Sequence, residues 1–211
     1  MDFSVIVTGV LEENCYVVHN DSKKCVIIDP GDDGDTILDF ISDNELCPLA
    51  ILLTHGHFDH VGAVVAIKEK FNIPVYIHQK DEYMISDPEQ KGIFDFGEND
   101  EFEADKYLED EQIICFDDLC FKVLHTPGHS AGSCCFLIDD CLFSGDTLFE
   151  GSIGRCDLEG GSFAKIMKSI NNKILILPDE LRVMPGHGDF TDIGTEKASN
   201  PYLTGDYEKF N

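Results

Sequence analysis

The chain has 211 residues, of which 43% are hydrophobic and 27% charged, so it is long enough for one large core and typical of a soluble globular protein. The formal net charge of −26 and the lack of a lysine or arginine cluster argue against a nucleic-acid-binding protein. No run approaches the roughly 18 apolar residues of a membrane span, and residues 1–5 lack the features of a secretion signal. We therefore expect a cytoplasmic protein with one domain over residues 1–211 and no membrane partner.

Strands and helices alternate in the first part of the chain. Short runs rich in β-branched residues, bounded by turn residues, indicate strands, and apolar residues at helical spacing indicate helices. The second helix is expected to begin at the histidine-rich segment 55–60, with Asp59 at its N-terminal end, where a carboxylate is favoured. The predicted elements are strands at 5–7, 15–18, 25–28, 50–53 and 74–78 and helices at 37–44 and 61–71.

A strongly acidic segment separates this part from the next. Residues 95–111 hold nine carboxylates and one lysine, without the regular spacing around a glycine that a calcium loop needs. We expect a solvated surface insertion there. The pattern then resumes with predicted strands at 120–124, 134–138, 141–143 and 181–184 and a helix at 163–170.

The nine cysteines form no C-x-x-C motif. Disulfides are rare in a reducing compartment, and most of the cysteines lie in apolar, strand-like runs. We expect them to be buried small hydrophobic residues. The alternative is a vicinal redox pair at Cys134 and Cys135.

The segment Thr54–His60 reads T-H-G-H-F-D-H and holds three of the eight histidines of the chain. It follows directly on the predicted strand 50–53, so one turn presents three imidazoles and a carboxylate. This combination suits zinc, iron or manganese.

Further candidate ligands follow other predicted strands. The Pro-Gly-His sequence occurs twice, ending at His129 and His187, and Asp146 follows the strand 141–143. A Pro-Gly turn can aim the next side chain at a shared point, and loops at one sheet edge converge in strand-helix folds. Seven candidates suit two ions roughly 3.5–4 Å apart with Asp146 shared between them. They are His55, His57, Asp59, His60, His129, Asp146 and His187.

The remaining histidines are His19, His78 and His125. We expect structural roles for all three. His125 is also a candidate to hold the second ring nitrogen of a ligating imidazole.

The motifs H-G-H-F-D-H, T-P-G-H-S, S-G-D-T-L-F and P-G-H-G, in this order over residues 55–188, resemble those of the metallo-β-lactamase superfamily. Asn14-Cys15-Tyr16 and the segment 28–31 fit the same family. The resemblance implies a four-layer αββα sandwich, with two mixed β-sheets flanked by helices. The most similar branch is that of glyoxalase II, the hydroxyacylglutathione hydrolases.

In that branch, the residues matching His55, His57 and His129 bind one metal ion, those matching Asp59, His60 and His187 bind a second, and the one matching Asp146 bridges. We expect two divalent ions, with zinc first and iron or manganese as alternatives.

The substrate side departs from that branch. Arg155 stands where glyoxalase II has a lysine that holds glutathione, and Asp157 stands about where a substrate-contacting tyrosine is expected. The chain ends at Asn211, and we expect no C-terminal helical domain of the kind that supplies much of the glutathione site. The resemblance thus implies the metals and hydrolysis more firmly than it implies glutathione.

The expected activity is hydrolysis of a small-molecule thioester. Two ions sharing a water can lower its pKa towards about 7, and Asp59 would both ligate and orient this nucleophile. One alternative is a persulfide dioxygenase with a single iron held by residues matching His55, His129 and Asp146; another is a lactonase or other ester hydrolase. β-Lactamase activity is not expected, because Asp146 replaces a cysteine common in those enzymes.

Overall fold

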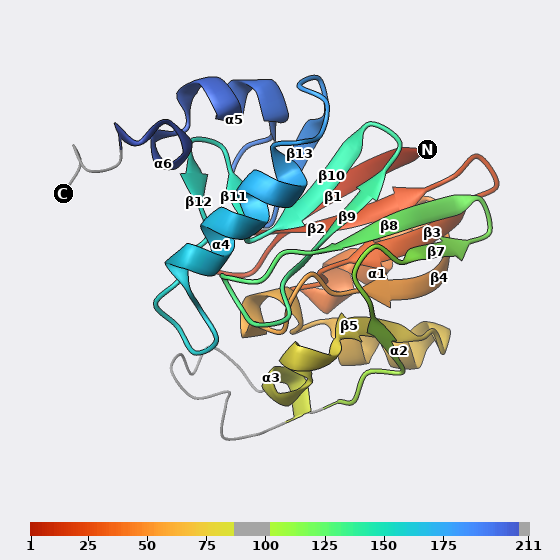
Figure 1. The fold of residues 1–211 in the computed structure, drawn as a ribbon. Coiled ribbons are helices and arrows are strands. Elements are labelled where there is room, and N and C mark those ends of the chain that lie inside the picture. The colour runs from red at the N-terminus through yellow and green to blue at the C-terminus, as the bar shows by residue number, and fades with distance from the viewer. Residues whose placement is uncertain (87–101, 207–211) are drawn as a thin grey trace.

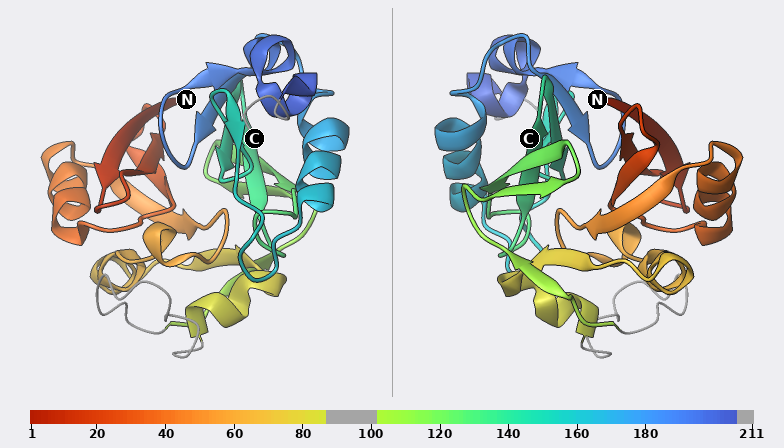
Figure 2. Two further views of the ribbon diagram at one scale, coloured as in Figure 1. Left: turned by 90° about the vertical axis from the view of Figure 1, so that its left-hand side faces the viewer. Right: turned by 90° about the vertical axis from the view of Figure 1, so that its right-hand side faces the viewer.

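The computed structural model describes residues 1–86 and 102–206. Two six-stranded sheets pack face to face, and helices cover the outer face of each sheet (Figures 1 and 2). This arrangement is the four-layer αββα sandwich that the motifs predict.

The first sheet is built from the N-terminal half of the chain, with its strands side by side in sequence order. The first three strands are antiparallel, and the last four pair in parallel. The strands are β1 (Asp2–Thr8), β2 (Glu13–His19), β3 (Lys24–Ile28), β4 (Cys47–Leu52), β5 (Val75–His78) and β6 (Lys106–Leu108).

The second sheet is built from the C-terminal half and has the order β14-β13-β10-β9-β8-β7. Only β10 and β13 pair in parallel. Its strands are β7 (Ile113–Phe116), β8 (Leu119–His125), β9 (Cys134–Ile138), β10 (Cys141–Gly145), β13 (Arg182–Pro185) and β14 (Thr191–Asp192), and a separate ribbon joins β11 (Leu148–Phe149) to β12 (Ser152–Ile153).

The helices form the outer layers. On the first sheet lie α1 (Gly34–Asp43) and α2 (Val64–Phe71); on the second lie α4 (Phe163–Ser169), which continues as a π-helical turn over Ile170–Ile174, and α5 (Ile193–Ser199) (Figure 2). The short helices α3 (Glu82–Ser86) and α6 (Pro201–Thr204) and the 3₁₀ turns Phe58–His60 and Gln79–Asp81 complete the described part.

Three hydrophobic clusters fill the three interfaces between the four layers. Strand β2 shows why its sequence is apolar throughout: Cys15 and Val17 face α1 and α2, whereas Tyr16 and Val18 face the second sheet. Because side chains alternate between the two faces of a strand, a strand covered on both faces has no solvent-facing positions.

The strands and helices expected from the sequence are present, with one correction at the histidine-rich segment. Phe58–His60 form a 3₁₀ turn, and α2 begins only at Val64. Asp59 is therefore in a turn that precedes the helix. The carbonyl of Gly31 accepts a hydrogen bond of 2.8 Å from Gly62 N, which holds this turn against the end of β3.

The expectation for the cysteines is wrong in part. Cys115 and Cys120 are exposed partners across the β7–β8 hairpin and form a disulfide, with their Cα atoms 4.1 Å apart. Strand β7 was not predicted, so the pairing could not be read from the sequence. Cys134 and Cys135 are buried and free, and because they are neighbours on β9 they face opposite cores. They do not form the vicinal redox pair that was the alternative.

The acidic segment 95–111 is only partly described, and residues 95–101 lie outside the described residues. Most residues of 102–111 are exposed, but the segment also contributes to a sheet and to the core. It contains β6, whose Leu108 is buried between the sheets, and Phe102 packs against the core under α2. Asp105 accepts a hydrogen bond of 2.9 Å from Val75 N and pairs with Lys68. The acidic composition concealed an edge strand.

In the part of the chain that the structure describes, no helix is both long and apolar enough to cross a bilayer.

Candidate metal centre

The predicted ligands meet at one end of the sandwich, where loops leave the C-terminal ends of four strands. Residues 55–60 follow β4, and His129, Asp146 and His187 follow β8, β10 and β13. The two sheets are joined there by backbone hydrogen bonds of 2.8 Å, from Cys134 N to the carbonyl of Thr54 and from Asn14 N to the carbonyl of Gly186. Both halves of the chain therefore contribute to one site.

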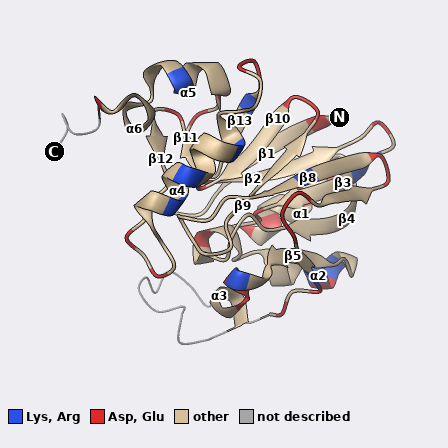
Figure 3. Ribbon diagram, in the orientation of Figure 1, with Lys and Arg blue, Asp and Glu red and all other residues tan. Residues whose placement is uncertain are grey.

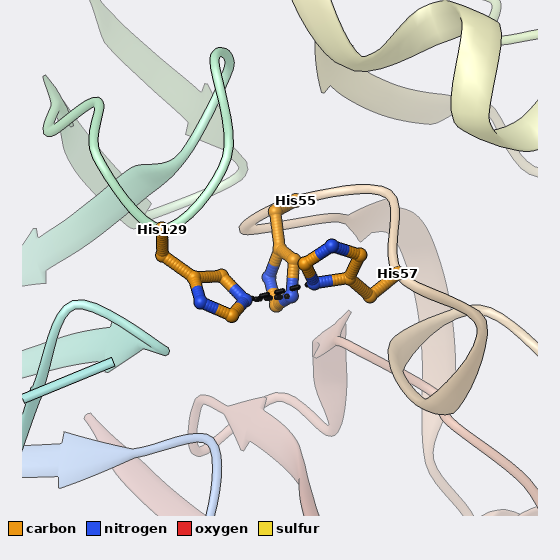
Figure 4. A group of neighbouring side chains, drawn as sticks. All are labelled: His55, His57 and His129. Atoms are coloured by element: carbon orange, nitrogen blue, oxygen red, sulfur yellow. Dashed lines mark hydrogen bonds between the residues drawn. The ribbon is translucent and has the colours of Figure 1, made fainter. Parts of the chain in front are cut away.

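His55, His57 and His129 form the first group (Figure 4). His129 Nε2 lies 2.8 Å from His57 Nδ1 and 3.1 Å from His55 Nε2. Nitrogens that share one tetrahedral zinc ion are about 3.3 Å apart. Three ring nitrogens that point at one another at this spacing suit a shared cation.

Asp59, His60 and His187 form the second group. His187 Nε2 lies 3.3 Å from Asp59 Oδ2, and His60 is completely buried beneath them. An imidazole pair with a carboxylate is again a donor set suited to a divalent transition metal.

Asp146 lies between the two groups. Its Oδ2 is 3.5 Å from His129 Nε2 and 3.8 Å from His187 Nε2, and its Oδ1 is 3.3 Å from His60 Nε2. Asp146 Oδ1 and His60 Nε2 are buried, and neither has a hydrogen-bond partner among the described residues. Buried polar atoms are normally satisfied, and a bound divalent cation would satisfy both atoms of this facing pair. The imidazole and carboxylate donors of both groups, with Asp146 between them, fit divalent metal ions.

His55 and His60 each have a second ring nitrogen, Nδ1, that faces away from the centre. These nitrogens are held by two residues outside the predicted ligand set, Asp29 and Thr54. Asp29 Oδ2 lies 3.0 Å from His60 Nδ1 and accepts a 2.5 Å hydrogen bond from the hydroxyl of Thr54. Thr54 Oγ1 in turn lies 3.0 Å from His55 Nδ1. In the sequence, Asp29 stands in the segment 28–31 that fits the family, directly after a predicted strand, but it is not among the candidate ligands.

Backbone carbonyls hold the Nδ1 atoms of His129 and His187, the two histidines that follow strands of the second sheet. His129 Nδ1 lies 2.9 Å from the carbonyl oxygen of Arg155, and His187 Nδ1 lies 3.0 Å from that of Leu11. A carbonyl accepts only from N–H, so each of these rings carries its proton on Nδ1 and presents Nε2 to the centre. Such partners orient a metal-ligating histidine and fix its tautomer.

The sequence model of the family described as the Metallo-beta-lactamase superfamily matches residues 8–187, a range that includes every candidate ligand. The chain belongs to this superfamily. The match agrees with the fold and with the convergence of the four loops.

Two named bacterial proteins resemble the chain over nearly their whole length. Probable metallo-hydrolase YqgX of Bacillus subtilis is 40% identical over 201 residues, which cover 93% of this chain and 95% of that protein. Hydroxyacylglutathione hydrolase GloC of Haemophilus influenzae is 36% identical over 208 residues, with 96% and 98% coverage.

Solved structures of superfamily members are also similar. BLEG-1 B3 metallo-beta-lactamase has a TM-score of 0.93 and 44% identity, with coverage of 97% of this chain and 100% of that one. TTHA1623 in a di-iron-bound form has a TM-score of 0.83 and 39% identity, with 95% and 100% coverage. The name of the first structure gives an activity, and that of the second gives a di-iron centre.

Electrostatics prepare the first histidine group to ligate. Burial lowers the pKa of His55, and the nearby imidazoles of His60 and His129 lower it further. Burial and then His129 lower the pKa of His57 to about 3. Both rings are neutral at neutral pH, which is the form of histidine that binds metal.

The carboxylates of the centre are charged. Burial alone would raise the pKa of Asp146, but the imidazoles of His60, His129 and His187 hold it well below its usual range. Burial also raises the pKa of Asp59, but the hydrogen bond with His187 and the imidazole of His60 together lower it below its ordinary value. Burial lowers the pKa of His60, but Asp146 and Asp29 raise it well above the ordinary value. The site holds anionic charge in a buried place, as a cation site requires.

The two Pro-Gly-His turns place their histidines as expected, but their glycines serve different needs. Gly128 has a φ of +147°, and a Cβ there would lie 2.2 Å from Ile166 N. Gly186 is not among the positive-φ glycines; its Cβ would lie 2.4 Å from Asp146 Oδ1 and 2.7 Å from His60 Cε1. The first glycine permits the turn, and the second leaves space for the ligands.

His125 does not contact a ligating imidazole. Its Nε2 lies 3.0 Å from the carbonyl oxygen of Ala131, in the loop that carries His129, and its ring stacks on that of His78 at 4.0 Å. The structural role expected for His78 and His125 fits these contacts, whereas the predicted hydrogen bond from His125 to a ligand is wrong.

Proposed function

We propose that the chain is a metal-dependent hydrolase of small-molecule thioesters, of the hydroxyacylglutathione hydrolase type. The observation that carries this proposal is the position of Asp146 between two donor groups, which suits a pair of metal ions. The similarity to GloC supports the thioester as the substrate class.

In this proposal His55, His57 and His129 hold one ion, Asp59, His60 and His187 hold the other, and Asp146 is shared. When bound, two divalent ions supply a Lewis acid for the carbonyl oxygen and lower the pKa of a water so that it attacks at neutral pH. The neutral rings of His55 and His57 need not lose a proton before they ligate.

Asp59 is the proposed catalytic carboxylate. Its lowered pKa keeps it ionised, and its contact with His187 Nε2 fixes its direction at the centre. An ionised carboxylate accepts a hydrogen bond from water and so orients the attacking lone pair. The leaving thiol has an ordinary pKa near 8.5, so it departs without a dedicated proton donor.

The test is thiol release from S-lactoylglutathione by purified protein of known metal content, with and without oxygen. We expect release in both conditions with about two ions bound per chain. Asp146→Ala and His57→Ala should abolish it, whereas His19→Ala, a histidine at the end of β2, should not. Oxygen uptake with glutathione persulfide and a single iron, without thiol release, would instead identify a dioxygenase.

A second candidate is β-lactam hydrolysis. BLEG-1, at 44% identity, is named a B3 metallo-beta-lactamase, although Asp146 stands in this chain where such enzymes commonly have a cysteine. The same preparation is therefore assayed with nitrocefin. Turnover of nitrocefin with no thiol release would replace the thioesterase proposal.

A further inference from the structure

The loop between β12 and α4 carries a charged pair at the rim of the metal centre. Arg155 Nε donates a 2.9 Å hydrogen bond to Asp157 Oδ1, and its Nη2 donates one of 2.8 Å to Oδ2. Both side chains reach solvent, with 52% of Arg155 and 70% of Asp157 exposed. The carboxylate thus occupies one complete edge of the guanidinium fork.

The backbone fixes this pair next to the ligands. The carbonyl of Arg155 accepts the hydrogen bond from His129 Nδ1. Gly154 lies so close to the Asp146 backbone that an added Cβ would be 1.8 Å from its carbonyl oxygen. The loop that carries the Arg155–Asp157 pair therefore lies beside the centre.

Arg155 is the only cation between residues 148 and 164, where Glu150, Asp157 and Glu159 are acidic. The hydrogen bond from Arg155 lowers the pKa of Asp157 to about 2, so the pair is fully ionised and has no net charge at neutral pH. Figure 3 shows acidic residues on many of the loops, in keeping with a net charge of −26. An anion that approached Arg155 would find its guanidinium already paired with Asp157.

We propose that Asp157 determines specificity by masking Arg155, so that the site favours thioesters whose thiol portion is uncharged at this rim over those that place a carboxylate there. The inference rests on the proposed function for its substrate class. The physical reason is competition: a substrate carboxylate needs the bidentate edge of the guanidinium, which Asp157 holds. A neutral amide-bearing thiol needs only one of the remaining N–H donors.

The kinetic test compares two thioesters that share one acyl group, S-lactoylglutathione and S-lactoyl-N-acetylcysteamine. We expect Asp157→Asn to lower the KM for S-lactoylglutathione, relative to the KM for S-lactoyl-N-acetylcysteamine, about fivefold. A change of this size matches the interaction energy of an exposed ion pair. The gain should shrink at high salt and vanish in an Arg155→Gln background. An unchanged ratio would overturn the proposal.

The matched control is Asp140→Asn. Asp140 pairs with Arg182 at 3.0 Å with similar exposure, but before the first residue of β10, at the end opposite Asp146. Its removal should leave the KM ratio unchanged. A ratio that shifts equally in this variant would show a general effect of net charge and would also overturn the proposal.

A binding measurement separates this proposal from the proposed activity. Titration calorimetry of the metal-loaded protein with S-hexylglutathione, which is not hydrolysed, reads the affinity of the rim for an anionic thiol portion. About fivefold tighter binding to Asp157→Asn than to the wild-type protein supports the masking role, even if no thioester is turned over. No gain in affinity contradicts it, even if the wild-type protein proves to be a thioesterase.

Discussion

Asp81 Oδ2 accepts a hydrogen bond of 2.5 Å from the hydroxyl of Ser130, the residue that directly follows His129. The other oxygen of Asp81 accepts one of 2.6 Å from Gly132 N, and the backbone of Gly56, between His55 and His57, also hydrogen-bonds to this carboxylate. Asp81 is completely buried. One carboxylate from the turn after β5 therefore joins the two loops that carry the first histidine group.

Asp81 should set the spacing of the first metal site without touching the metal. We expect Asp81→Ala to weaken zinc binding by about 10- to 100-fold, the usual effect of losing a residue that orients metal ligands. Zinc affinity is measured by competition with a chromophoric chelator, and the spectrum of the cobalt-substituted protein reports ligand geometry.

The matched control for Asp81 is Asp105→Asn. Asp105 also accepts a hydrogen bond from a backbone N–H, that of Val75, but this contact lies in the first sheet and away from the ligand loops. Equal losses of zinc affinity in both variants, or an unaltered cobalt spectrum in Asp81→Ala, would show that Asp81 acts only on general stability.

Asp146→Ala tests whether this carboxylate serves both donor groups. Its oxygens approach His129, His187 and His60 within 3.8 Å, so its removal should leave at most one tightly bound ion per chain. Because metal ions stabilise the transition state by several kcal/mol, kcat/KM should fall on the order of a thousandfold. Elemental analysis and thiol-release kinetics give both values. A variant that retains two ions and the full rate would refute the shared position.

The ligands could be predicted from sequence because each follows a strand that the apolar pattern also reveals. The segment 54–60 is contiguous, and the Pro-Gly-His turns ending at His129 and His187 are recognisable by themselves. In a sandwich whose strands end at one edge, such turns must converge. The four-layer arrangement is implied by the resemblance of these motifs to the metallo-β-lactamase superfamily, not by the apolar pattern alone.

The supporting residues could not be predicted in this way, because their roles depend on contacts between distant segments. Asp81 lies 49 residues before Ser130 and belongs to no motif. Cys115 and Cys120 pair through the register of a hairpin whose first strand, Ile113–Phe116, is apolar but only four residues long. Strand β6 lies in the acidic segment, where composition favours solvent exposure over pairing.

Metal removal should lower stability, because an ion that binds only the folded chain adds to the free energy of unfolding. At a free-metal concentration 100 times the dissociation constant, this contribution is about 2.7 kcal/mol. For a chain of this size that corresponds to roughly 5–10 °C in Tm. We expect a shift of this size when EDTA-treated and zinc-loaded protein are compared by scanning calorimetry. An equal Tm would mean that the centre binds no zinc under these conditions.

The His78–His125 stack should make the metal-free protein less stable in acid. Burial and then the imidazole of His125 lower the pKa of His78 to about 4, with a further contribution from Lys80 and an opposing one from Asp110. Between about pH 6.5 and the folded-state pKa of about 4, His78 is therefore protonated in the unfolded chain but neutral in the folded chain. The stability associated with His78 is present above this window and is lost as the pH falls through it.

We test this with urea unfolding of metal-free protein at pH 7 and pH 5. The loss of unfolding free energy between the two pH values should be smaller in His78→Gln than in the wild-type protein, because glutamine does not titrate. His19→Gln, at the end of β2 and outside the stack, is the matched control and should keep the wild-type loss. If His78→Gln loses as much stability as the wild-type protein, the acid sensitivity arises elsewhere, and the stacked pair is not its source.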